Sequence, residues 1–139
     1  MRIRYLLPLV LMGQTAPPPT AAEDNEIVVT ARKMSNRWAG RVSTLDGQSS
    51  CVTTKSTGDP EFDTVGCNSL LKCWPEYFPK IEAALKVEVA AGRVKTSEEM
   101  QRVLLREPVR GLFGKVGKCS RPLIFKGVRA ILKQRKLAR

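Results

Sequence analysis

The sequence predicts a small, mainly α-helical α+β domain with three to four helices, one short strand or hairpin, and two disulfide bonds. Three observations lead to this fold class. Much of the 139-residue chain after residue 59 places apolar residues at helical spacing. A β-branched run at residues 51–54 precedes a glycine turn. The four cysteines are an even number that can form two bridges in a domain with a modest core.

Residues 1–22 have the pattern of a secretory signal peptide. Arg2 and Arg4 give a positive start, residues 5–12 form a short apolar run, and small residues precede a cleavage point after Ala22. Cleavage would remove two positive charges and reduce the net charge from +11 to +9. A secreted chain with four cysteines is expected in an oxidising compartment, and the bacterial periplasm fits best.

Residues 23–36 are expected to form a flexible N-terminal segment that carries one strand. Acidic residues precede a β-branched run of Ile27, Val28, Val29, Thr30 and Ala31. Such a run on a mobile tail is suited to pairing with the sheet edge of a partner. Residues 37–139 are expected to form a single disulfide-stabilised domain, in which Trp38 and Leu45 anchor the basic first part.

Residues 51–74 predict a strand, a turn and a helix. Residues 51–54 favour a strand, and Gly58 suits the turn that follows because it adopts positive φ without strain. Asp59 can cap the helix, and Pro60 fits its first turn, where no N–H donor is needed. Pro75 predicts that this helix ends at Trp74.

Helix geometry restricts the pairing of the cysteines. Cys67 and Cys73 lie on the same predicted helix, where six residues rise about 9 Å and differ by about 240° in direction. A disulfide needs Cα atoms roughly 4.4–6.8 Å apart, so these two should not pair. Of the two connectivities that remain, we favour Cys51–Cys67, which joins strand to helix, and Cys73–Cys119, which joins the C-terminal region to the rest.

The remaining chain predicts three further helices and one loop. A helix over residues 79–91 buries Ile81, Leu85 and Val89 and is followed by Gly92. A second, over 96–106, begins with a Thr96/Glu99 capping box. Three glycines at residues 111–117 predict a connecting loop over 109–118. The last helix is expected to begin at Ser120, with Pro122 in its first turn.

Two short segments resemble known families. Cys51-Val52-Thr53, Ser56-Thr57-Gly58, Phe62-Asp63 and Cys67 resemble the start of the C-terminal domain of TonB-type energy transducers. Glu26 to Ala31 resembles the TonB box of outer-membrane receptors. These resemblances imply a TonB-type periplasmic partner, with Ile27 to Ala31 as the strand that pairs with it. The rest of the chain matches neither family.

The sequence contains no recognisable catalytic constellation. It has no histidine, which excludes Ser-His-Asp and Cys-His catalysis and histidine metal sites. The cysteine spacing differs from the close pairs of zinc sites, and no Cys-x-x-Cys redox motif is present. We therefore expect no enzyme activity, no metal and no cofactor.

Two function hypotheses remain open. The first is a non-enzymatic periplasmic interaction protein that is linked to the TonB system through Ile27 to Ala31. The second is a cationic binder of the envelope surface, either anionic lipid or lipopolysaccharide, acting through Lys126, Arg129, Lys133, Arg135 and Lys136 on the last helix. Nucleic acid is not an expected partner, because most aromatic residues are assigned to the core and cannot stack on bases.

Overall fold

The computed structural model describes residues 21–139, so the expected signal peptide lies almost wholly outside the described residues. The described chain forms α1 (Ala21–Arg37), β1 (Ala39–Leu45), β2 (Gln48–Lys55), α2 (Pro60–Ala90), α3 (Ser97–Leu104) and α4 (Val109–Leu137). The mainly α-helical fold class is confirmed, and so are the hairpin and both disulfides, Cys51–Cys67 and Cys73–Cys119.

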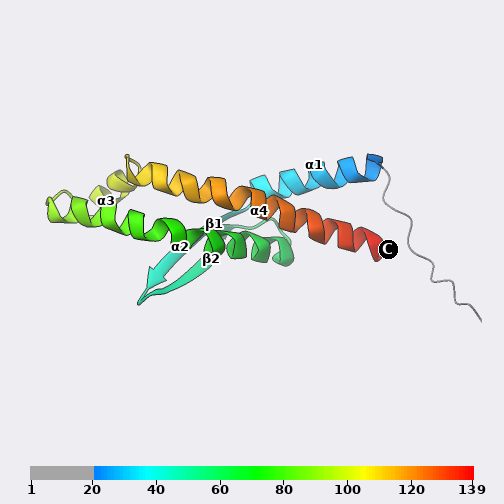
Figure 1. The fold of residues 1–139 in the computed structure, drawn as a ribbon, viewed down its shortest axis with the longest axis horizontal. Coiled ribbons are helices and arrows are strands. Elements are labelled where there is room, and N and C mark those ends of the chain that lie inside the picture. Colours follow the sequence, from blue (N-terminus) through cyan, green and yellow to red (C-terminus); the bar gives the residue numbers. More distant parts are fainter. Residues whose placement is uncertain (1–20) are drawn as a thin grey trace, which may run out of the picture.

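The molecule is elongated along two long antiparallel helices, α2 and α4 (Figure 1). Helix α1 lies beside the C-terminal half of α4, α3 lies at the opposite end, and the hairpin projects from the middle. One buried cluster joins α2, α3 and the first half of α4: Cys73, Trp74, Ile81, Val103, Val109 and Val116. A second joins α1, the start of α2 and the second half of α4: Ala31, Phe62, Ile124 and Val128.

Two tryptophans and the first disulfide hold the hairpin against α2: Trp38 directly before β1, Trp74 of α2, and Cys51–Cys67. Trp38 Nε1 donates to Thr53 Oγ1 at 3.2 Å, and Trp74 Nε1 donates to Thr44 Oγ1 at 2.8 Å. Trp38 packs on the second cluster, as expected, and lies so close to Gly66 of α2 that a Cβ there would sit 2.3 Å from its ring. Leu45 was expected to be an anchor, but it adjoins the turn at the tip of the hairpin and is 77% exposed.

Residues 23–36 are helical, which corrects the expected flexible segment with a strand. They belong to α1, in which Ile27 and Ala31 are buried, Val28 and Thr30 are half-buried, and Val29 is exposed. Ile27, Ala31 and Met34 lie at i, i+4 and i+7, so a helix presents all three on one face. Packing of this face against α4 outweighs the strand preference of the β-branched run.

Helix α2 continues through Pro75 and Pro79, so the expected break after Trp74 is wrong. Proline inside a helix removes one hydrogen bond and costs about 3 kcal/mol. Both prolines are exposed, so water can reach the carbonyl groups that lose a partner. Burial of Trp74 before Pro79 and of Ile81 after it, in the same cluster, keeps the two halves of the helix in line. Val89, expected on the buried face, is exposed near the end of α2.

Residues 109–118 are helical rather than a loop, and α4 runs unbroken from Val109 to Leu137. Each helical glycine costs about 1 kcal/mol relative to alanine. Val109 and Val116 are buried in the first cluster, with Leu112 packed against it, and this burial opposes the glycine penalty. Ser120 therefore lies inside the helix instead of capping it, and its Oγ donates to the Gly117 carbonyl at 3.3 Å.

Two of the predicted helix starts, at Asp59 and at Thr96, are confirmed, whereas residue 79 lies inside α2. The Asp59 side chain accepts from the Glu61 N–H at the start of α2, with Pro60 in the first turn. The Thr96 side chain accepts from the Glu99 N–H at the start of α3. Gly92 has a φ of 72° directly after the C-terminal end of α2, as a helix-terminating glycine should.

Candidate functional site

The positive charge of the protein is concentrated on α4. Its sequence contains Lys and Arg but no Asp or Glu. The two residues that follow it are not acidic either. Cations clustered on one helix contribute a local positive potential that attracts anions. The cations of α4 are Arg110, Lys115, Lys118, Arg121, Lys126, Arg129, Lys133, Arg135 and Lys136.

The C-terminal part of α4, where the anion-binding residues were expected, is largely used to hold the fold together. Of the five expected residues only Lys126 is exposed, whereas Arg129, Lys133, Arg135 and Lys136 are half-buried. Lys133 Nζ lies 4.0 Å from an Asp24 carboxylate oxygen of α1. Arg129 has a buried Nε atom, and Arg135 is engaged with α2. The expected site is therefore placed too far along the helix.

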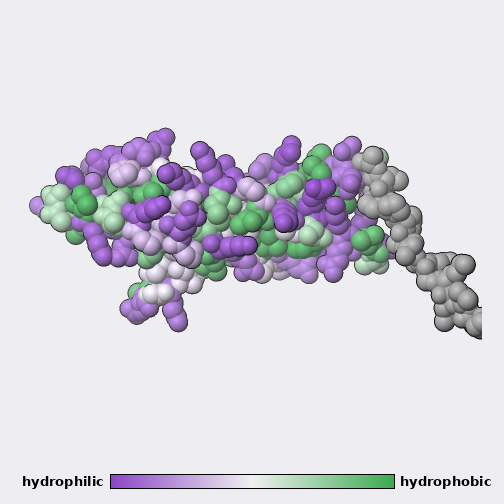
Figure 2. Space-filling view, viewed as in Figure 1, coloured by the Kyte–Doolittle hydropathy of each residue, from purple (hydrophilic) through white to green (hydrophobic). Residues whose placement is uncertain are grey.

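The exposed cations lie in the first and middle parts of α4. Arg110, Lys115, Lys118 and Arg121 are exposed, as is Lys126, and among the described residues none of the five forms an ion pair. Hydrophilic side chains cover much of the face that Figure 2 shows, with apolar residues between them. Arg110, Lys115 and Lys118 were not among the expected residues, because the glycines around them predict a loop. The signal in the sequence is the lack of acidic residues after residue 108.

Three lysines converge on a shallow hollow between α2 and α4. Lys80, Lys115 and Lys118 line a space of about 560 Å³ together with Glu76, Tyr77 and Cys119. Lys80 Nζ lies 5.6 Å from the centre of the Tyr77 ring. The Cys73–Cys119 disulfide joins the two helices beside this hollow. The disulfide therefore fixes the two helices that carry these lysines, so the backbone needs no ordering when an anion binds.

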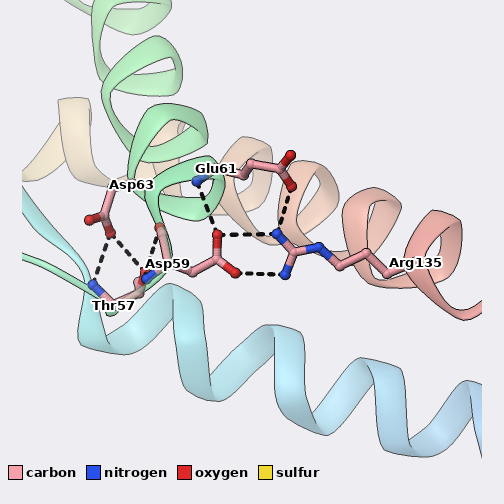
Figure 3. Close-up of polar contacts among 5 residues, drawn as sticks. All are labelled: Thr57, Asp59, Glu61, Asp63 and Arg135. Atoms are coloured by element: carbon pink, nitrogen blue, oxygen red, sulfur yellow. Dashed lines mark hydrogen bonds and ion pairs between the residues drawn. The ribbon is translucent and has the colours of Figure 1, made fainter.

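Arg135 links the C-terminal end of α4 to the start of α2 (Figure 3). Its Nη1 donates to Asp59 Oδ2 at 2.6 Å, and its Nη2 donates to Asp59 Oδ1 at 3.2 Å and to Glu61 Oε2 at 2.6 Å. The guanidinium also lies 4.9 Å from the Phe62 ring centre. The Arg135 hydrogen bond holds the pKa of Asp59 below its usual value, and the carboxylates raise the pKa of Arg135. We interpret this contact as structural, because its donors already point at protein carboxylates.

A second carboxylate organises the turn before α2. Asp63 accepts from the backbone N–H of Thr57 at 2.9 Å, from the Thr57 hydroxyl at 2.8 Å, and from the Ser56 hydroxyl. Partial burial alone would raise the pKa of Asp63, but these hydrogen bonds outweigh it, and the pKa lies below its usual value. The carboxylate is thus an acceptor for the turn rather than a general acid or base.

The Arg135 contact predicts how stability depends on pH. Because the folded-state pKa of Asp59 is depressed, its contribution is present above the unfolded-state pKa of about 3.9 and is lost as pH falls through the folded-state pKa. In the Arg135→Gln variant, the free energy of unfolding should therefore fall less than in the wild type between about pH 5 and pH 2. Urea unfolding midpoints at pH 7, 5, 4 and 3 measure this, with exposed Arg121→Gln as the control. Equal pH profiles for the two variants would contradict it.

Free thiols, histidines and clusters of metal-binding side chains are absent from the described residues. All four cysteines are in disulfides, and the sequence has no histidine. Between residues 21 and 139, no cluster of three or more Cys, Asp or Glu side chains could hold a metal ion. In the same region, no helix combines the length and apolar character needed to cross a membrane.

Comparison with family models, curated proteins and solved structures assigns no family to this chain. No family model matches it, and neither the curated proteins nor the solved structures contain a match. A TonB-type partner therefore stays a prediction. The strand expected to bind it, Ile27 to Ala31, is helical and partly buried in the structure.

Proposed function

We propose that the protein is a secreted, non-enzymatic binder of anionic envelope surfaces, which it contacts with the outward face of α4. The observation that carries this proposal is the set of five exposed cations, Arg110, Lys115, Lys118, Arg121 and Lys126, on a helix without an acidic residue. Two intact disulfides are compatible with an oxidising compartment such as the periplasm.

The apolar face of α4 determines the mode of binding. Val116, Ile124 and Val128 are buried in the protein core, so α4 cannot insert an apolar face between lipid chains. Its contact with a surface is electrostatic, at about 1 kcal/mol for each Lys or Arg near an anionic membrane. Such binding weakens strongly with salt because the exposed charges are screened.

The aromatic residues favour lipid head groups over nucleic acid. Phe62 and Trp74 are buried, Trp38 and Phe125 are packed against core residues, and Phe113, at 38%, is the only exposed aromatic residue among the described ones. Sequence-independent binding of single strands relies on exposed aromatic rings that stack on bases. Phosphate groups on a lipid or lipopolysaccharide surface need only the cations that α4 provides. We therefore assign the surface to anionic lipid head groups.

Vesicle binding tests this proposal. The oxidised protein should bind phosphatidylglycerol-containing vesicles at low salt. It should release them at about 0.5 M salt, because the salt screens the exposed charges. Changing Lys115, Lys118 and Lys126 to Gln should reduce the partition coefficient by about a hundredfold, since about 1 kcal/mol is lost for each of the three charges. Cosedimentation measures the bound fraction.

The matched control removes the same charge from other surfaces. Lys33, Lys55 and Lys95 are exposed on α1, β2 and the loop before α3, and their triple Gln variant has the same net charge as the first variant. An equal loss of binding in both variants would show attraction to net charge alone and would reject the α4 site. Tighter binding to a DNA duplex than to vesicles at equal salt would reject the assignment to lipid.

A further inference from the structure

One edge of β1 has no strand beside it in the described fold. The sheet has two strands, and β1 pairs only with β2. The two-residue turn Asp46-Gly47 makes Leu45 and Gln48 a hydrogen-bonded pair, so hydrogen-bonded and non-hydrogen-bonded pairs alternate from there. The backbone N–H and C=O groups of Gly40, Val42 and Thr44 therefore point away from β2. Among the described residues they have no hydrogen-bond partner across this edge.

A groove runs along this free edge, between β1 and α4. One hollow of about 740 Å³ is lined by Ala39 and Gly40 of β1, and a second of about 260 Å³ by Gly40, Arg41 and Val42. Successive residues of a strand point to opposite faces. A hollow that is lined by consecutive residues therefore meets the strand along its edge rather than on one face. Gly40 of β1 and Gly117 of α4 line both hollows, so the two lie next to each other along the edge.

The walls of the groove are mixed, with apolar side chains beside Ser35, Asn36 and Ser120, and its charged residues are positive. Leu70, Trp74, Phe113 and Phe125 contribute to the walls. Arg121 lines the larger hollow and Arg41 the smaller one, and no Asp or Glu lines either of them. A ligand that fits this chemistry presents apolar groups toward α4 and carboxylates toward the rim.

We propose that this groove binds an extended segment of a partner protein in which apolar and acidic residues alternate, as a third strand beside β1. A strand at about 4.8 Å from β1 would pair with the outward groups of Gly40, Val42 and Thr44. Every second side chain would then face the α4 wall, and the others would lie near Arg41 and Arg121. A helix or a lipid chain would leave these backbone groups unpaired, which is why the occupant is an extended peptide.

Gly117 allows the groove to be filled without disturbing the fold. No atom lies within 4 Å of the position that its Cβ would take, and the same holds for Gly114 on the same helix. Gly114 lines neither hollow. Leucine is a better helix former than glycine, so Gly117→Leu and Gly114→Leu should both fold. The two variants differ in whether the new side chain occupies the groove.

Selection of random octapeptides on the oxidised full-length protein tests the proposal. The selected peptides should alternate apolar and acidic residues. Fluorescence anisotropy with the best synthetic peptide should show at least tenfold weaker binding to Gly117→Leu and an unchanged affinity for Gly114→Leu. Two further peptides carry N-methyl groups on alternate backbone nitrogens, one on the odd and one on the even positions. One of the two should bind at least tenfold more weakly, because only alternate N–H groups of a strand can pair with β1.

The rim charge provides a second test that does not depend on filling the groove. Arg121→Glu should reduce the affinity for the acidic peptide at least fivefold. The same variant should bind more tightly a peptide in which Lys replaces the acidic residues. Failure to enrich any peptide, or selection of peptides without acidic residues, would overturn the proposal. Equal binding to Gly117→Leu and Gly114→Leu would also overturn it, as would insensitivity to methylation in both registers.

Discussion

Replacing Cys73 and Cys119 together by alanine should lower the free energy of unfolding by about 4 kcal/mol, from the chain-entropy model of a disulfide. The bond closes a segment of 46 residues, which includes the second half of α2, all of α3 and the first part of α4. Without it, the unfolded chain gains the conformational freedom of this long loop. The folded protein also loses a covalent link at its first buried cluster, in which Cys73 is 2% exposed.

The second disulfide provides the comparison for this prediction. Cys51–Cys67 closes only 16 residues, so its double alanine variant should lose about 3 kcal/mol. Urea unfolding followed by circular dichroism gives both values under the same conditions. If the Cys51/Cys67 variant is the less stable of the two, loop length does not determine the contribution of these bonds.

Local signals in the sequence predicted the elements that depend on neighbouring residues. The Asp59 cap and the Thr96 cap each involve one side chain and a backbone N–H two or three residues away. The disulfide pairing followed partly from geometry within one helix, which excluded Cys67–Cys73, and α2 does contain both of these residues. Such features need no knowledge of how distant segments pack.

The errors occurred where packing outweighs local preference. Pro75 and the glycines of residues 111–117 are helix breakers by propensity, yet α2 and α4 continue through them because each packs along the other. The helical signal of α1 was present in the sequence. Asp24 suits the N-terminal end of a helix and Arg37 the C-terminal end, with Ile27 and Ala31 spaced by four residues between them.

The sequence predicted the chemistry of the candidate anion-binding face, but it located only part of that face. Its chemistry, a cationic helix at the C-terminal end of the chain, followed from composition. Its position depends on which cations find carboxylates in the folded protein. Arg135 meets Asp59 from 76 residues away, and this contact cannot be inferred from spacing along the chain. The free edge of β1 likewise becomes visible only when the hairpin is placed beside α4.

The largest effect of a single substitution is expected at Trp74. Its side chain is 6% exposed, its ring centre lies 5.4 Å from that of Phe78 and 6.2 Å from that of Phe113, and its Nε1 donates to Thr44 of the hairpin. Trp74→Ala should lower the free energy of unfolding by about 3–5 kcal/mol, since it leaves a cavity where α2, α4 and β1 meet.

A milder substitution separates packing from hydrogen bonding at this position. Trp74→Phe keeps an aromatic ring in the first cluster but removes the donor to Thr44, and a typical hydrogen bond contributes about 1 kcal/mol. Because Thr44 is only half-buried, water can replace the lost donor, so most of the destabilisation of Trp74→Ala should be absent from Trp74→Phe. Urea unfolding of both variants measures the difference. A loss of stability in Trp74→Phe as large as that in Trp74→Ala would show that the contact with the hairpin, rather than the filled core, determines the stability of this junction.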